Sequence, residues 1–156
     1  GTTFSFSIPF ESDLDKTNDL INNIRVDLST SQIFKVLVVE DNRINQLVTK
    51  KIMEKNLYKC CVVDDGYEAL KILETEIFDI ILMDINMPLL NGFETTRLIR
   101  NKNITTPIIA LTAFDKEEIS EEAISAGMND IIIKPFDQSK LFKAMSTLIY
   151  DAKNVG

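Results

Sequence analysis

The feature that most constrains the fold is a change in the sequence pattern at Phe34, after which short apolar runs alternate with amphipathic segments. Five runs have the length of strands, and they lie within residues 36–39, 60–63, 80–83, 107–111 and 131–133. A continuous apolar run indicates a strand that is covered on both faces, and strands that alternate with helices indicate parallel pairing. The sequence therefore predicts an α/β fold with a five-stranded parallel sheet between two layers of helices.

The segments between these runs carry apolar residues at helical spacing. One predicted helix has Ile44, Leu47, Val48 and Ile52 on one side, and the next has a buried stripe of Ala69, Leu70, Leu73 and Ile77. Residues suited to cap helices lie at the predicted ends: Asp65, Asn91, Asp115 and Asp137 at starts, and Gly127 at an end. The compact size favours the doubly wound, flavodoxin-like strand order 2-1-3-4-5.

The chain divides into four parts by composition. Residues 1–10 alternate as a half-buried strand does, and Pro9 ends the pattern. Residues 11–33 are polar and are predicted to form a linker. The folded domain is predicted to span residues 34–150, and residues 151–156 are predicted to be a C-terminal tail.

Composition excludes several kinds of function. The formal net charge is −7, whereas nucleic-acid-binding domains normally present a basic face, so no nucleic-acid partner is expected. The chain has no histidine, which excludes histidine catalysis and histidine metal ligands within it. Its two cysteines, Cys60 and Cys61, are adjacent, which indicates a reducing compartment, and we expect a cytoplasmic location. No apolar run is long enough to span a membrane, so no membrane contact is expected of this segment.

Polar side chains follow the predicted strands at the edge where such folds carry their sites. Glu40 and Asp41 follow the first strand, Asp84 the third, Thr112 the fourth and Lys134 the fifth. Because the first and third strands are neighbours in the predicted order, the three carboxylates should cluster.

Three clustered carboxylates repel one another unless a cation neutralises them, and oxygen ligands alone favour Mg2+. Mg2+ readily accepts a phosphate oxygen, and Asp84 could serve as the nucleophile of a phosphoryl transfer because carboxylates form acyl phosphates. Lys134 would then stabilise the transferred oxygens, and Thr112 would donate a hydrogen bond to one of them.

Other uses of this layout fit the sequence less well. It contains neither GxGxxG nor GxxxxGK[ST], and an acidic loop after the first strand would repel a bound nucleotide phosphate. A Mg2+-dependent phosphohydrolase remains an alternative, although it would typically need a second carboxylate where Asn86 stands. A degenerate domain that only binds a partner is a further alternative, against which the complete set of five residues argues.

Residues 35–150 resemble the receiver domain of two-component response regulators. The matching segments are Val38-Val39-Glu40-Asp41-Asn42, Asp65-Gly66-Tyr67-Glu68-Ala69-Leu70, Asp84-Ile85-Asn86-Met87-Pro88, Asn91-Gly92, Ala110-Leu111-Thr112-Ala113, Ala126-Gly127-Met128-Asn129-Asp130 and Lys134-Pro135-Phe136. The resemblance implies that Asp84 is the phosphoacceptor, and that Glu40, Asp41, Asp84 and the backbone carbonyl of Asn86 hold Mg2+. It also implies that Thr112 is the switch hydroxyl, that Lys134 binds phosphate, and that the Lys134–Pro135 bond is cis.

The segment Asn42-Arg43-Ile44-Asn45-Gln46 is similar to receivers of hybrid sensor kinases, and residues 1–9 look like the last strand of a kinase ATP-binding domain. These resemblances imply that the chain is a piece of a hybrid histidine kinase, and that the full-length kinase could be anchored in a membrane. The expected partners are a histidine kinase domain or a histidine phosphotransfer protein. The segment lacks kinase nucleotide-binding boxes, so its own expected chemistry is the phosphorylation and dephosphorylation of Asp84.

One position departs from the family pattern. Receivers usually have Tyr or Phe three residues before the lysine, where this chain has Ile131. Ile131 therefore occupies the second switch position without an aromatic ring. Phe114, two residues after Thr112, is expected either to shield the acyl phosphate from water or to pack against Ile119.

Overall fold

The structure is a computed structural model, and it describes residues 33–155. A compact unit begins at Phe34, the residue at which the sequence pattern changes. The strand predicted at residues 1–10 and the linker predicted at 11–33 lie outside the described residues, apart from Ile33.

The described part contains one parallel sheet of five strands in the order β2-β1-β3-β4-β5, which confirms the predicted topology. The strands are β1 (Lys35–Val39), β2 (Lys59–Val63), β3 (Ile80–Asp84), β4 (Ile108–Thr112) and β5 (Asp130–Ile133). The order reverses between β1 and β3, which are hydrogen-bonded neighbours with Val39 paired to Met83. Parallel strands all end at the same edge, so the residues that follow β1, β3, β4 and β5 gather there.

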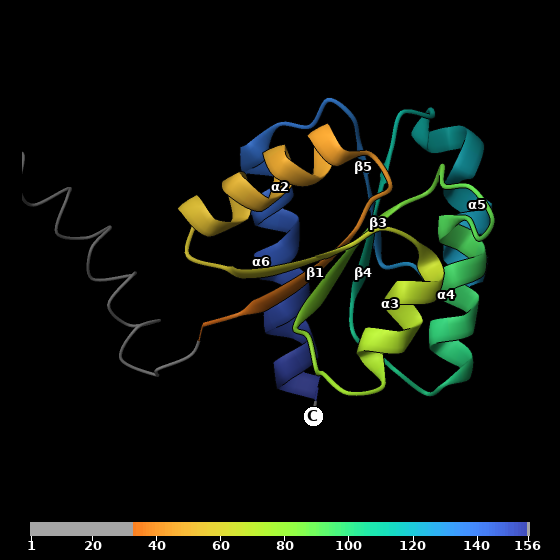
Figure 1. Cartoon of the computed structure of the whole chain (residues 1–156), viewed down its shortest axis with the longest axis horizontal. Helices are drawn as coiled ribbons and strands as arrows, with labels where there is room; N and C mark the ends of the chain where they lie inside the picture. Colours follow the sequence, from red (N-terminus) through yellow and green to blue (C-terminus); the bar gives the residue numbers. More distant parts are fainter. Residues whose placement is uncertain (1–32, 156) are drawn as a thin grey trace, which may run out of the picture. The chain divides into compact units, whose positions relative to one another are not determined.

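Helices cover both faces of the sheet (Figure 1). On one face lie α2 (Arg43–Lys55) and α6 (Gln138–Val155), and on the other lie α3 (Gly66–Leu73), α4 (Gly92–Asn101) and α5 (Lys116–Ala126). The last helix continues past residue 150, where the sequence placed the end of the domain, so residues 151–155 are helical rather than a separate tail.

The core has two layers because successive strand residues point to opposite faces. Val36 and Val38 of β1 pack with Leu141 and Met145 of α6. Leu37 and Val39 pack toward the other face, where the cluster includes side chains of α3, α4 and α5. Every residue of β3 and β4 is buried, as the continuous apolar runs of these central strands predict.

Side chains cap the helices at the predicted positions. Asn91 accepts a hydrogen bond from the backbone of Glu94, whose carboxylate accepts one from the backbone of Asn91, a complete capping box. Asp115 also caps its helix, but it accepts from the backbone of Glu117 rather than Glu118. Gly127 ends α5 in the left-handed conformation with φ +108°, which glycine adopts without strain.

Two predicted apolar stripes differ from the observed packing. In α2 the buried residues are Thr49 and Met53, whereas Ile44, Leu47 and Val48 are exposed. The inward position is held by Thr49, a polar residue that gives no hydrophobic signal, so the apolar residues of the sequence indicate the wrong face of the helix. Ile77, predicted to be buried, is 87% exposed because α3 ends at Leu73 and the helical register does not reach residue 77.

None of the helices in residues 33–155 combines the length and apolar character needed to cross a membrane.

Candidate functional site

Three carboxylates meet at the carboxyl edge of the sheet. Glu40 and Asp41 directly follow β1, and Asp84 is the last residue of β3. One carboxylate oxygen from each lies within 4.8 Å of the other two. Glu40 and Asp84 are buried, with 3% and 6% exposure, whereas Asp41 is exposed. Two buried acids therefore share a cluster with one acid that faces solvent.

Lys134 brings a positive charge to this cluster from the end of β5. Its Nζ atom lies 2.8 Å from Oε2 of Glu40 and 3.6 Å from Oδ1 of Asp84. The backbone N–H of Lys134 donates to the carbonyl of Thr112, and the Lys134–Pro135 peptide bond is cis, as the resemblance implied. The ammonium group therefore bridges the two buried carboxylates.

Thr112 and Asn86 lie on the flanks of the cluster. Thr112 ends β4 and is 2% exposed, and its Oγ1 accepts a hydrogen bond of 3.0 Å from the backbone of Phe114. Accepting that bond leaves the hydroxyl hydrogen free to donate to another group. Asn86 is exposed in the loop after β3, and its N–H donates to Oδ1 of Asp84 at 3.2 Å. Phe114 is 39% exposed, so its ring is only partly packed.

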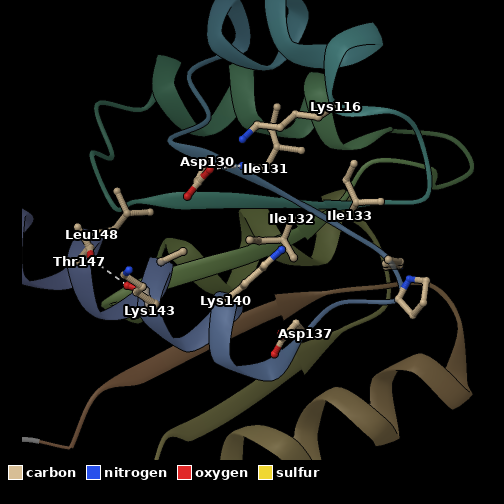
Figure 2. Close-up of a pocket in the computed structure, with 13 residues that line it drawn as sticks. Lys116, Asp130, Ile131, Ile132, Ile133, Asp137, Lys140, Lys143, Thr147 and Leu148 are labelled. Carbon is tan, nitrogen blue, oxygen red and sulfur yellow. Dashed lines mark hydrogen bonds between the residues drawn. The ribbon is translucent and has the colours of Figure 1, made fainter.

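Ile131 lies apart from the carboxylates, in the middle of β5. Figure 2 shows that Ile131 and Ile133 lie on the side of β5 that faces Lys116 of α5. Ile132 lies on the opposite side, toward α6. Ile131 is 8% exposed and belongs to the core cluster that includes Ile119 and Ala123 of α5. A groove of about 780 Å³ extends along β5 and α6 as far as Lys134 and Pro135.

Burial and neighbouring charges shift the pKa values of the two buried carboxyls, Glu40 and Asp84, in opposite directions. Burial raises the pKa of Asp84 to about 7, and the negative charge of Glu40 adds to this effect. Burial also acts to raise the pKa of Glu40, but hydrogen bonds from Lys134 and the backbone of Asn42 outweigh it and hold that pKa below its ordinary value. Of the two buried carboxyls, Glu40 is therefore the more acidic, and Asp84 takes up a proton more readily than an ordinary aspartate.

The donor set suits a hard divalent cation. It consists of carboxylate oxygens, with neither thiolate nor imidazole in the cluster, which is the ligand type that Mg2+ takes in proteins. Asp41, which is exposed, leaves one side of the cluster open for water or for a phosphoryl oxygen.

Two contacts at the site did not follow from the sequence motifs. The backbone N–H of Asn42 donates to Oε1 of Glu40 at 3.1 Å while its side chain caps α2. The side chain of Gln46 donates to the carbonyl of Glu40. A polar residue one turn into a helix that follows an acidic strand end is the signal that could have indicated the second contact.

Comparison with known proteins identifies this arrangement. Residues 36–146 match the family model of the response regulator receiver domain. The chain is 38% identical over 142 residues to the autoinducer 2 sensor kinase/phosphatase LuxQ of Vibrio vulnificus, an alignment that covers 90% of this chain. It is 36% identical over 159 residues to the hybrid signal transduction histidine kinase K of Dictyostelium discoideum, covering 96% of this chain. The chain spans 17% and 13% of the length of these relatives.

Solved structures show the same fold. The receiver domain of the sensor histidine kinase PA1611 from Pseudomonas aeruginosa, which has a magnesium ion in its active site cleft, is 37% identical with a TM-score of 0.70. That match covers 76% of this chain and 98% of the other. The receiver domain of the Francisella response regulator 1452 is 34% identical with a TM-score of 0.72, with the same coverage. Fold, family match and identity agree, and the chain belongs to the response regulator receiver domain family of two-component signalling.

Proposed function

We propose that this receiver accepts a phosphoryl group from a phosphohistidine onto Asp84 and then hydrolyses it or passes it to a histidine phosphotransfer partner. The observation that carries the proposal is the placement of Asp84 beside both the ammonium group of Lys134, 3.6 Å away, and the carboxylates of Glu40 and Asp41. A carboxylate with an adjacent fixed cation and a metal-type donor set is suited to phosphoryl transfer.

In the proposed step, a carboxylate oxygen of Asp84 attacks phosphorus in line with the donor nitrogen. The phosphorus–nitrogen bond breaks, its electron pair returns to the imidazole, and a phosphorus–oxygen bond forms. Lys134 stabilises the negative charge on the transferred oxygens, and the free hydroxyl hydrogen of Thr112 donates to one of them.

Glu40, Asp41, Asp84 and the backbone carbonyl of Asn86 would hold Mg2+ at this site. When bound, Mg2+ would neutralise charge on the carboxylates and on the phosphoryl oxygens. Its charge would also favour the ionised form of Asp84, which is the form that attacks phosphorus.

The same proposal places the chain in a hybrid histidine kinase. The match to the Dictyostelium kinase covers 96% of the chain and so extends into residues 1–33, where residues 1–10 would be the last strand of a kinase ATP-binding domain. Because the chain has no histidine, the phosphohistidine lies on a kinase domain or a phosphotransfer protein outside it. The site is proposed to work in the cytoplasm.

The test is phosphorylation with acetyl phosphate and Mg2+, followed by mass spectrometric mapping of the acid-labile phosphate. We expect one phosphoryl group on Asp84 in the parent chain and none in Asp84→Asn. Asp115→Asn is the matched control because it makes the same chemical change at an exposed cap, and asparagine caps a helix about as well. Incorporation into Asp84→Asn at the parent rate would exclude Asp84 as the acceptor.

A further inference from the structure

Gln46 makes two short contacts at the edge of the carboxylate cluster. It lies one turn into α2 and is half-buried. Its Nε2 atom lies 2.6 Å from the backbone carbonyl oxygen of Glu40 and 2.6 Å from Oδ1 of Asp64, just after β2. One side chain therefore joins the ends of two neighbouring strands, β1 and β2, to the helix that connects them.

The first of these contacts fixes the peptide from which both acidic side chains project. The carbonyl of Glu40 belongs to the peptide group that links Glu40 to Asp41, and a peptide group is planar. The N–H of Glu40 donates to the carbonyl of Val63 at 3.2 Å. The backbone of Glu40 is therefore held on its amino side by β2 and on its carbonyl side by Gln46.

The second contact gives Gln46 a fixed orientation. A carboxamide nitrogen carries two hydrogens, and here one is directed to Glu40 and the other to Asp64. Asp64 is itself held, because its backbone N–H donates to Oε1 of Glu68 on α3 at 2.9 Å. The chain of contacts thus runs from the Glu40–Asp41 peptide through Gln46 and Asp64 to a second helix.

We propose that Gln46 is a positioning residue for the metal site: its side-chain amide sets the plane of the Glu40–Asp41 peptide, so that both carboxylates project toward Asp84. This proposal rests on the proposed function, because it assigns Gln46 to the Mg2+ site of that function. Groups that orient metal ligands typically change metal affinity about 10–100-fold when removed.

The decisive variant is Gln46→Met, which keeps the length and lack of charge of the side chain but removes both donors. Mg2+ affinity is measured by calorimetry on the complete chain without any phosphodonor. We expect Gln46→Met and Gln46→Ala to bind Mg2+ about tenfold more weakly than the parent. Gln138→Met is the matched control, since Gln138 is exposed, and its affinity should stay within about twofold. Asp41→Ala, which removes a proposed ligand, shows how much Mg2+ affinity is lost when a ligand itself is removed.

A second measurement separates positioning from a general loss of stability. With acetyl phosphate, the Mg2+ concentration that gives half the maximal rate should rise about tenfold in Gln46→Met, while the rate at saturating Mg2+ should return to near the parent value. A variant that melts at a lower temperature yet binds Mg2+ as the parent does would overturn the proposal and leave Gln46 a structural residue.

The coupling between Gln46 and Asp64 provides a further test. If the two residues act as one unit, Asp64→Ala should weaken Mg2+ binding less than Gln46→Met, and the double variant should be no worse than Gln46→Met alone. Full additivity of the two losses would contradict the proposed chain of contacts. Failure of the proposed function would be seen separately, as a parent chain that binds Mg2+ but takes no phosphoryl group on Asp84.

Discussion

At the scale of single residues, the carboxyl of Asp84 lies in surroundings that disfavour its charge. Its pKa of about 7 in the metal-free protein is well above the ordinary value of 3.8. A raised folded-state pKa means that the folded state binds the proton more tightly than the unfolded state. The contribution of this group to stability is therefore complete below about pH 4 and is lost as the pH rises through about 7.

We therefore predict that Asp84→Asn raises the melting temperature of the metal-free protein clearly more at about pH 8 than at about pH 5. The neutral amide is nearly isosteric and removes the repulsion from Glu40. Thermal melts in a chelating buffer at both pH values check the prediction. The prediction would be contradicted if the difference in melting temperature between the variant and the parent were the same at both pH values.

Arg100 acts at the opposite edge of the sheet from the carboxylates. Its half-buried guanidinium donates to the carbonyls of Ile104, Thr106 and Gly127 and to Oδ1 of Asn129, at 2.8 to 3.0 Å. We predict that Arg100→Ala lowers the free energy of unfolding by about 2–4 kcal/mol, because several carbonyls lose a charged donor. Urea denaturation measures the loss, and Mg2+ affinity should not change.

Arg97→Ala is the control for the loss of an arginine on the same helix. Arg97 forms an exposed ion pair of 3.4 Å with Glu122, and exposed pairs contribute about 0–1 kcal/mol. A loss in Arg100→Ala no larger than in Arg97→Ala would mean that water satisfies the freed carbonyls.

At the scale of elements, the start of α4 approaches the end of β3 without room for a side chain. A Cβ atom on Gly92 would lie 2.5 Å from the carbonyl oxygen of Asp84 and 2.8 Å from Cα of Ile85. Both are backbone atoms, so the helix or the strand end would have to move. We predict that Gly92→Ala lowers the free energy of unfolding by about 1–3 kcal/mol and also weakens Mg2+ binding, because Asp84 shifts.

Gly127→Ala separates these two effects. Gly127 has φ +108°, so alanine there is strained, and a Cβ would meet the side chain of Arg100 rather than the site. Its stability should fall without any change in Mg2+ affinity. Equal Mg2+ affinities in Gly92→Ala, Gly127→Ala and the parent would show that the close approach at Gly92 does not position Asp84.

The elements differ in how far the sequence predicts them. The runs at β1, β3 and β4 are apolar without a break because both faces of a central strand are covered, and this signal needs no knowledge of neighbours. The inward face of α2 does not follow from the sequence, because Thr49 is buried there while Ile44 is 70% exposed. Burial of a helix residue depends on where the helix docks, which local spacing alone does not determine.

At the scale of the whole molecule, the same distinction holds for the site. Glu40, Asp84 and Lys134 could be predicted to converge because the topology alone brings the ends of their strands to one edge. The contact of Gln46 with Asp64 and the contacts of Arg100 could not, because they join groups that belong to separate elements. Strand ends are set by connectivity, whereas these side-chain contacts are set by the final packing of helices on the sheet.

Phosphorylation of Asp84 is expected to change the molecule mainly near Thr112. When Asp84 is phosphorylated, we expect Thr112 to move toward a phosphoryl oxygen and to vacate space beside β5. An aromatic residue at position 131 would swing into that space and alter the surface. Ile131 is β-branched, 8% exposed and packed in the cluster that includes Ile119 and Ala123 of α5, so it has few rotamers and little freedom to move. We therefore expect the response to be mostly backbone movement of the loop after β4.

The measurement is a comparison of amide chemical shifts with and without beryllium fluoride, which mimics the acyl phosphate, in the presence of Mg2+. Large shifts should be confined to residues 112–116 and to the neighbourhood of Asp84, and the protein should keep its oligomeric state. Such a limited response would suit a relay receiver, because a histidine partner needs access to Asp84 rather than a newly formed dimer face. Equally large shifts at Ile131 and along α6, together with dimer formation, would refute this account, because they would require the packed β5 face to rearrange without an aromatic switch.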